Sequence, residues 1–98
     1  MLIRIVKMKF KPEAVEGFQM LFQKNKEKIR HFEGCQRLEL YQDQKDPTLF
    51  FTYSYWNSES HLNAYRHSAL FAEVWKATKT GFSQKAEAWS LDKLIELN

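Results

Sequence analysis

The stretch from Leu49 to Phe71 constrains the fold most, because it runs from an aromatic strand through one polar cap into an amphipathic helix. Wide or stiff side chains suit a pleated, half-buried surface, and they fill the strand: Phe50, Phe51, Tyr53, Tyr55 and Trp56. The next three residues supply the short oxygens and negative charge that the N–H groups of a helix start require: Asn57, Ser58 and Glu59. A helix that follows a strand through so short a cap must fold back over its own sheet.

Residues 1–34 predict a strand followed by a helix. Side chains alternate from Leu2 to Lys11, which is the period of a strand with one strongly apolar face. Pro12 suits the first helical turn, where its missing N–H is not needed. Seven positions then recur at helical spacing: Ala14, Phe18, Leu21, Phe22, Asn25, Ile29 and Phe32. Gly34 suits the left-handed residue that closes a helix.

Residues 36–91 predict two strands joined by a hairpin, a divided helical region and a last strand. The polar stretch 42–48 is typical of a hairpin loop, which here joins a strand at 36–43 to the aromatic strand. Ser68 predicts a second helix cap, and the helical spacing after it ends near Gly81. From Ser83 to Leu91 the alternation of a strand returns.

The predicted order over one domain, residues 1–98, is strand, helix, strand, strand, helix, strand. This is the βαββαβ order of the α+β ferredoxin-like fold, whose four-stranded antiparallel sheet carries helices on one face. The other face is predicted to mix aromatic and charged side chains: Arg37, Glu39, Tyr41, Phe51, Tyr53, Tyr55, Lys85, Glu87 and Trp89. Such a face is too aromatic for a fully wet sheet and too charged for a monomer core. We therefore expect a twofold homodimer through this open sheet face, with the tail at 92–98 docking on the partner.

Composition and charge exclude several classes of protein. The net charge of +3 comes from scattered basic residues rather than one basic face with stacking groups, so we expect no nucleic-acid partner. No apolar run approaches the roughly 20 residues of a membrane span, and charges interrupt residues 1–10 where a signal peptide needs a continuous apolar core. We therefore expect a cytoplasmic protein without a membrane partner. Cys35 is the only cysteine, which excludes an internal disulfide and a cysteine zinc site.

The three histidines are the candidates for proton transfer near neutral pH. His61 lies four residues before Tyr65 on the same helix face, so both can reach a pocket; the alternative is a solvated position in the first helical turn. His67 precedes the break at Ser68, where its side chain can turn inward or outward. His31 is expected to complement the negative end of the first helix. The three histidines are well separated and have no matching carboxylate, so we expect no metal site.

Arg4 and a stripe of aromatic residues are the candidates for ligand binding. Arg4 falls on the apolar face of its strand, where a charge is costly unless it is paired or wet. It either reaches solvent at the sheet end or points into a cleft and holds a phenolate or carboxylate. The helical aromatic stripe forms either core or the apolar wall that a flat substrate needs. The residues expected to bind substrate are Arg4, Met8, Trp56, Tyr65, Phe71 and Trp75.

Two segments, KPEAVEGF and EGCQRLELYQDQKDPTLFFTYSYWNSESHLNAYRHSALF, together resemble the antibiotic biosynthesis monooxygenase family. The most telling elements are Glu33-Gly34-Cys35, Tyr41-Gln42-Asp43 before Asp46-Pro47-Thr48, Trp56 at the strand end, and Ser68 with Phe71. The resemblance implies a dimeric α/β barrel with a small pocket between sheet and helices in each subunit. It also implies a possible activity, because some members of the family oxidise quinols, anthrones or other phenolic rings with dioxygen, without metal or flavin.

The chain departs from the family pattern at two positions. Many members carry histidines where this chain has Tyr65 and Leu70, in an HxxSPHF-like pattern, whereas this chain reads YRHSALF. The haem-degrading branch, which is also similar, uses an Asn, a Trp and a His where the alignment places Arg4 or a close neighbour, Tyr65 and Trp75. The Trp75 indole can donate a hydrogen bond but has no free lone pair with which to bind iron. Haem degradation by that route is therefore not expected.

The expected function is oxidation of a small phenolic or quinol-type molecule by dioxygen, without a cofactor. In that mechanism a base forms the substrate phenolate, which passes an electron to dioxygen inside a dry pocket. Arg4 would stabilise the anion, and His61 or His67 would be the base. The alternative is a non-catalytic small-ligand-binding or structural homodimer of the same fold, which the missing family histidines favour.

Overall fold

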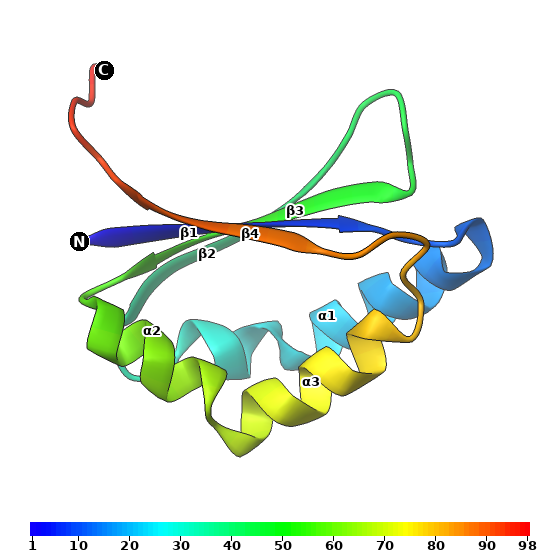
Figure 1. The fold of residues 1–98 in the computed structure, drawn as a ribbon, viewed down its shortest axis with the longest axis horizontal. Coiled ribbons are helices and arrows are strands. Elements are labelled where there is room, and N and C mark those ends of the chain that lie inside the picture. The colour runs from blue at the N-terminus through cyan, green and yellow to red at the C-terminus, as the bar shows by residue number, and fades with distance from the viewer.

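A computed structural model describes all residues, 1–98, and shows one sheet with every helix on the same side (Figure 1). The strands are β1 (Leu2–Lys9), β2 (Cys35–Gln42), β3 (Leu49–Trp56) and β4 (Glu87–Asp92). The helices are α1 (Val15–Arg30), α2 (Glu59–Arg66) and α3 (Ala69–Lys79), with a 3₁₀ turn at Pro12–Ala14. The predicted α+β, ferredoxin-like order is confirmed.

The sheet is antiparallel throughout, in the order β2-β3-β1-β4. Its register sets Arg4 of β1 opposite Ser54 of β3 and Ser90 of β4. Directly paired residues of neighbouring strands point to the same face. The three side chains therefore lie in a row on the face that the helices cover.

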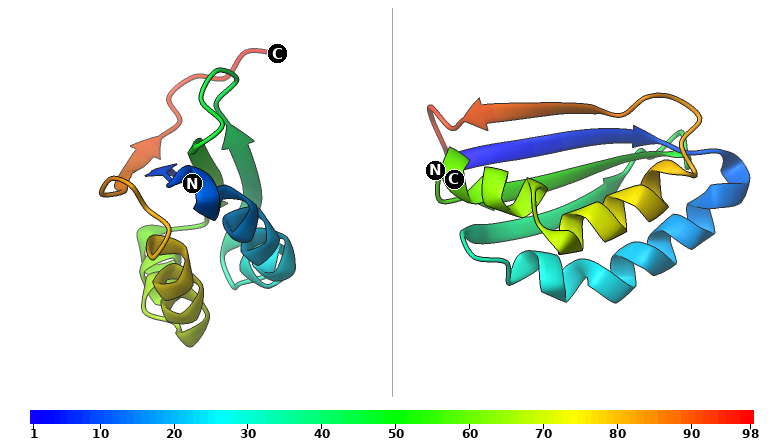
Figure 2. Two further views of the ribbon diagram at one scale, coloured as in Figure 1. Left: turned by 90° about the vertical axis from the view of Figure 1, so that its right-hand side faces the viewer. Right: turned by 60° about the horizontal axis from the view of Figure 1, so that its bottom comes forward.

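The ends of the helices follow the predicted capping residues. The Ser58 hydroxyl accepts a hydrogen bond from the backbone N–H of His61 at 3.2 Å, and the Ser68 hydroxyl accepts one from the N–H of Phe71 at 3.1 Å. Gly34 follows α1 with a φ of 90°, a conformation that costs side chains with a Cβ. Ser68 thus divides the second helical region, and α2 and α3 run one after the other beside α1 (Figure 2).

The hydrophobic core is divided into two clusters. One holds four buried side chains, Met8, Phe10, Phe18 and Phe50. The other holds three, Cys35, Trp56 and Leu62. Cys35 packs as predicted, and burial raises the pKa of its thiol. Helices and sheet therefore meet at two places rather than along one continuous core.

The last strand begins later than the predicted Ser83, at Glu87. Residues near Ser83 still contact the first strand, because Phe82 forms an isolated bridge with Phe10 and the Ser83 N–H donates to the Lys9 carbonyl at 2.9 Å. Alternation shows which face a side chain takes but does not show where an edge strand starts pairing.

The sheet face opposite the helices stays open. Large apolar side chains are exposed there: Tyr41 at 50%, Trp89 at 42% and Leu91 at 44%. The β2–β3 loop and the C-terminal tail both extend on this open side, away from the helices (Figure 1). None of the helices combines the length and the apolar character that crossing a membrane requires.

Candidate functional site

A cavity of about 280 Å³ lies between the sheet and the helices, lined by 20 residues of which 14 are hydrophobic. It sits between the two core clusters, since it touches Met8 and Phe18 of one and Trp56 and Leu62 of the other. An apolar cavity of about 150 Å³ already holds a benzene ring. The space is therefore suited to one substituted ring.

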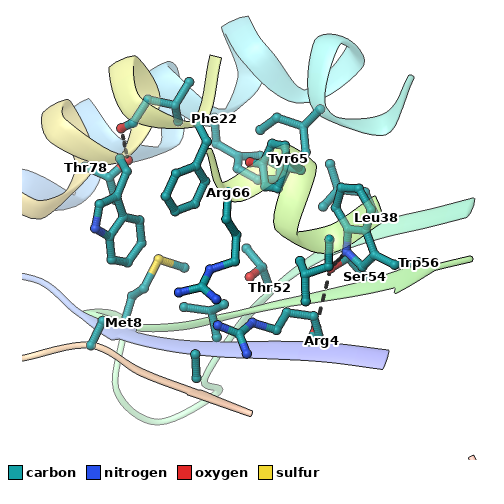
Figure 3. Close-up of a pocket in the computed structure, with 18 of the residues that line it drawn as sticks. Arg4, Met8, Phe22, Leu38, Thr52, Ser54, Trp56, Tyr65, Arg66 and Thr78 are labelled. Atoms are coloured by element: carbon teal, nitrogen blue, oxygen red, sulfur yellow. Dashed lines mark hydrogen bonds between the residues drawn. The ribbon is translucent and has the colours of Figure 1, made fainter. Parts of the chain in front are cut away.

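The structure brings together all six residues that the sequence predicted for ligand binding. Each of them lines the cavity: Arg4, Met8, Trp56, Tyr65, Phe71 and Trp75. They come from β1, β3, α2 and α3, so the site depends on the helices folding back over the sheet. Figure 3 shows most of the residues that line it.

Four aromatic rings form one continuous wall. Trp56 stacks on Tyr65 with centroids 5.0 Å apart, and Tyr65 meets Phe71 edge to face at 5.2 Å. Phe71 in turn stacks on Trp75 at 5.7 Å, one helical turn further along α3. Rings at these separations support one another, and the wall presents flat apolar surface to a flat ligand. The stripe is therefore both packed and exposed to the cavity.

One hydrogen bond holds this wall in place, and one hydroxyl group on it is free to bind a ligand. The Trp56 indole N–H donates to the hydroxyl of Ser54 at 3.0 Å, and both residues are buried. The hydroxyl of Tyr65 has no hydrogen-bond partner in the chain, and burial raises the pKa of Tyr65 to about 12. Tyr65 thus stays neutral and offers a hydrogen bond to a ligand.

Arg4 points into the cavity rather than out at the sheet end, as Figure 3 shows. Its Nη1 donates to the Ser90 hydroxyl at 3.0 Å. Burial, followed by the positive charge of Arg66, lowers the pKa of Arg4. A guanidinium remains charged even so, which places a positive charge inside a mostly apolar site.

The histidines do not line the cavity. Nδ1 of His61 lies 2.7 Å from the Ser58 hydroxyl, and its ring covers the backbone of Gly34. His67 is exposed, and its Nδ1 donates to the Asn63 carbonyl at 2.7 Å. His31 is exposed at the end of α1, with its Nδ1 2.9 Å from the Glu27 carbonyl. In this conformation none of them can take a proton from a molecule in the cavity.

Sequence reasoning missed Arg66, which lines the cavity from the last position of α2. A signal was present, because Arg66 follows the buried Leu62 by four residues and so shares its helix face. The smaller polar side chains Thr52 and Ser54 of β3 also line the cavity. Nowhere in the chain do three or more His, Cys, Asp or Glu side chains gather as metal ligands would.

The sequence profile of the antibiotic biosynthesis monooxygenase family matches residues 1–77. A comparison with curated proteins finds no match. Among solved structures, an antibiotic biosynthesis monooxygenase is similar with a TM-score of 0.91 and 25% identity, over 97% of this chain and 100% of that one. A conserved protein from Methanosarcina mazei Go1 is similar with a TM-score of 0.87 and 27% identity, over 94% and 92% of the two chains.

Rv0793 from Mycobacterium tuberculosis shares the fold, with a TM-score of 0.88 and 16% identity over 99% of this chain and 98% of that one. The fold is thus kept while most side chains change. Because the family profile covers more than three quarters of the sequence, the chain belongs to the antibiotic biosynthesis monooxygenase family.

Proposed function

We propose that the protein oxidises a small phenolic or quinol-type molecule with dioxygen, as a monooxygenase. One observation carries the proposal: a cavity of about 280 Å³ with a continuous aromatic wall contains the guanidinium of Arg4. The wall suits a flat ring. The guanidinium suits the phenolate that must form before such a ring can pass an electron to dioxygen.

The reaction balances without an external reductant. A quinol and dioxygen give a hydroxyquinone and water: one oxygen atom bonds to a ring carbon, and the other leaves as water. The two hydrogens and two electrons that form the water come from the quinol itself. The protein then has to bind the ring, keep it ionised and exclude bulk water.

We assign to Arg4 the role of stabilising the ionised substrate. A positive charge within a few ångströms lowers the pKa of a phenol because it favours the anion. Ionisation can then deliver the proton to solvent, without a base in the cavity. The roles predicted for His61 and His67 as base stay predictions, and both would require a change of side-chain position.

The experiment is oxygen uptake by chelator-treated protein over a panel of quinols. Arg4→Gln should lower turnover by about tenfold or more, since a removed anion-stabilising donor costs at least that much. Lys7→Gln is the matched control, because Lys7 lies on the same strand with its side chain on the open face, 3.9 Å from Glu87. Equal rates in Arg4→Gln and wild type would remove Arg4 from the reaction. An unchanged rate in His61→Ala would remove the base role of that residue.

A second candidate is a non-catalytic ligand-binding protein of the same fold. The observation that favours it is the position of the histidines outside the cavity. Ligand binding in a thermal-shift screen with no oxygen uptake by any quinol would support this candidate against the oxidase.

We also propose that a second copy of the chain covers the open sheet face. The exposed aromatic and apolar side chains there, and the exposed tail residues Leu94, Ile95 and Leu97, support this. Trp89→Glu would bury an unpaired charge from each copy in the contact and should give a monomer by light scattering where wild type gives a dimer. A monomeric wild type in dilute solution would overturn the assignment.

A further inference from the structure

The cavity contains a second guanidinium besides that of Arg4. Arg66 ends α2, and Figure 3 shows its side chain descending from the helix toward the sheet, where Arg4 reaches in from β1. Both line the same cavity. The charge of Arg66 contributes to lowering the pKa of Arg4, which is the electrostatic sign of two like charges close together.

Neither guanidinium has a negative partner. The side chain of Arg66 makes no hydrogen bond or ion pair within the chain, and the Arg4 guanidinium donates only to the neutral hydroxyl of Ser90. Glu87 is the one carboxylate residue among those lining the cavity, and its carboxylate pairs with Lys7 at 3.9 Å.

The other two arginines of the chain differ in this respect. Arg30 donates to the Cys35 carbonyl at 2.9 Å, and Arg37 donates to the Glu39 carboxylate at 2.9 Å. Both therefore have a protein acceptor that accounts for their position. Arg4 and Arg66 place two positive charges around an aromatic-walled space without a carboxylate partner, and the partial burial of Arg4 makes its charge costly unless an anion pairs with it.

The two arginines also differ in depth. Arg66 is exposed, whereas Arg4 is half-buried on the floor of the cavity. A ligand that neutralises both charges is anionic at its outer end and able to become anionic at its inner end, with a flat apolar body between. Guanidinium groups bind carboxylates and phenolates through charge-assisted hydrogen bonds.

We propose that the substrate is a phenolic or quinol-type carboxylic acid, with its carboxylate on Arg66 and its reacting hydroxyl group on Arg4. This assignment of substrate class rests on the proposed function for the identity of the ring, and on the two arginines for the acid. The ionised substrate then carries two negative charges against the two positive ones. The outer carboxylate also sets which end of the molecule enters the cavity.

The test is a binding measurement by calorimetry without oxygen, so that no turnover is needed. The probes are dihydroxyphenylacetic acid with its two hydroxyl groups para to each other, the neutral amide of this acid, unsubstituted hydroquinone, and phenyl phosphate. Wild type should bind the acid at least about tenfold more tightly than the amide, a difference of about 1.4 kcal/mol. The preference should fall as potassium chloride is added, because a partly exposed ion pair is screened by salt.

The variant that decides the matter is Arg66→Gln, which should bind acid and amide alike. Because Arg66 is exposed and its side chain has no hydrogen bond or ion pair to lose, this variant should fold, and Arg66→Lys should recover part of the preference. Lys76→Gln is the control, since it removes the same charge from α3 at an exposed residue outside the cavity. An acid preference that survives in Arg66→Gln, or phenyl phosphate binding more tightly than the acid, would overturn the proposal.

Binding and oxygen uptake separate this inference from the proposed function. Acid-selective binding that depends on Arg66, without oxygen uptake, would support the anion site and overturn the oxidase. Oxygen uptake with hydroquinone, but no preference for the acid over the amide, would support the oxidase and overturn the anion site.

Discussion

Replacement of Ser54 by alanine should destabilise the protein by more than a surface substitution does. The Trp56 indole N–H donates to the Ser54 hydroxyl at 3.0 Å, and the two residues are only 1% and 7% exposed. Ser54→Ala leaves that N–H buried without an acceptor, which costs about 1–3 kcal/mol. The wall of the cavity would lose the bond that holds the Trp56 ring at its angle.

The expected shift in melting temperature follows from the size of the chain. An unfolding entropy of about 2.1 cal/mol/K per residue gives about 0.2 kcal/mol/K for 98 residues. A loss of about 2 kcal/mol therefore lowers the melting temperature by about 10 °C. Calorimetry and urea unfolding should agree on this loss, with Ser60→Ala as the control because Ser60 is exposed on α2.

A double-mutant cycle isolates the hydrogen bond from other effects of the substitution. Trp56→Phe removes the donor, so Ser54→Ala should cost little on that background, with a coupling free energy of about 1–2 kcal/mol. If Ser54→Ala costs the same with Trp and with Phe at position 56, the indole bond is not the cause. A loss below about 0.5 kcal/mol in the single variant would refute the reasoning at once.

Two further predictions concern the ends of the sheet. Gly34→Ala should destabilise the protein by about 1–2 kcal/mol or more in urea unfolding, because Gly34 has a φ of 90° and a new Cβ would lie 2.4 Å from side-chain carbons of His61; Gly17→Ala, which meets nothing within 4 Å, should not. A Gly34→Ala protein as stable as wild type would contradict the strain. At the β2–β3 loop, hydrogen bonds from Lys9 and then Thr48 lower the pKa of Asp46 to about 2. The carboxylate then stabilises the fold above its ordinary pKa of 3.8, and this stability is lost as the pH falls through about 2. Asp46→Asn should therefore be less stable than wild type at neutral pH, with a difference that shrinks over that acid range; a constant difference would contradict the assignment.

Local signals in the sequence predicted the elements well because each of them acts within a few residues. Ser58, Ser68 and Gly34 each satisfy or close a helix end by themselves, and the structure places each where the sequence did. Strand alternation placed Arg4 and Met8 on the covered face for the same reason. What a residue does to its own backbone can be derived without knowing its neighbours in space.

The composition of the site was less accessible, because it depends on side-chain choices between elements. His61 had the right helix face for a pocket residue, but the Ser58 hydroxyl and the surface of Gly34 hold its ring elsewhere. Arg66 was detectable only by taking the face of Leu62 one turn further. No periodic pattern encodes the cavity, which exists because sheet and helices meet at two clusters and not between them.

The divided core has a consequence for how a substrate could be found. Only 13 of the 98 residues are buried, few for a domain that has to hold a layer of helices on a sheet. A molecule that fills the space between the clusters would act as a missing piece of the interior and would raise the energy needed to unfold the chain. At a hundredfold excess over its dissociation constant, such a molecule adds about 2.7 kcal/mol. Heating the protein with a library of aromatic acids should thus identify its natural occupant by the increase in melting temperature, before any reaction has been observed.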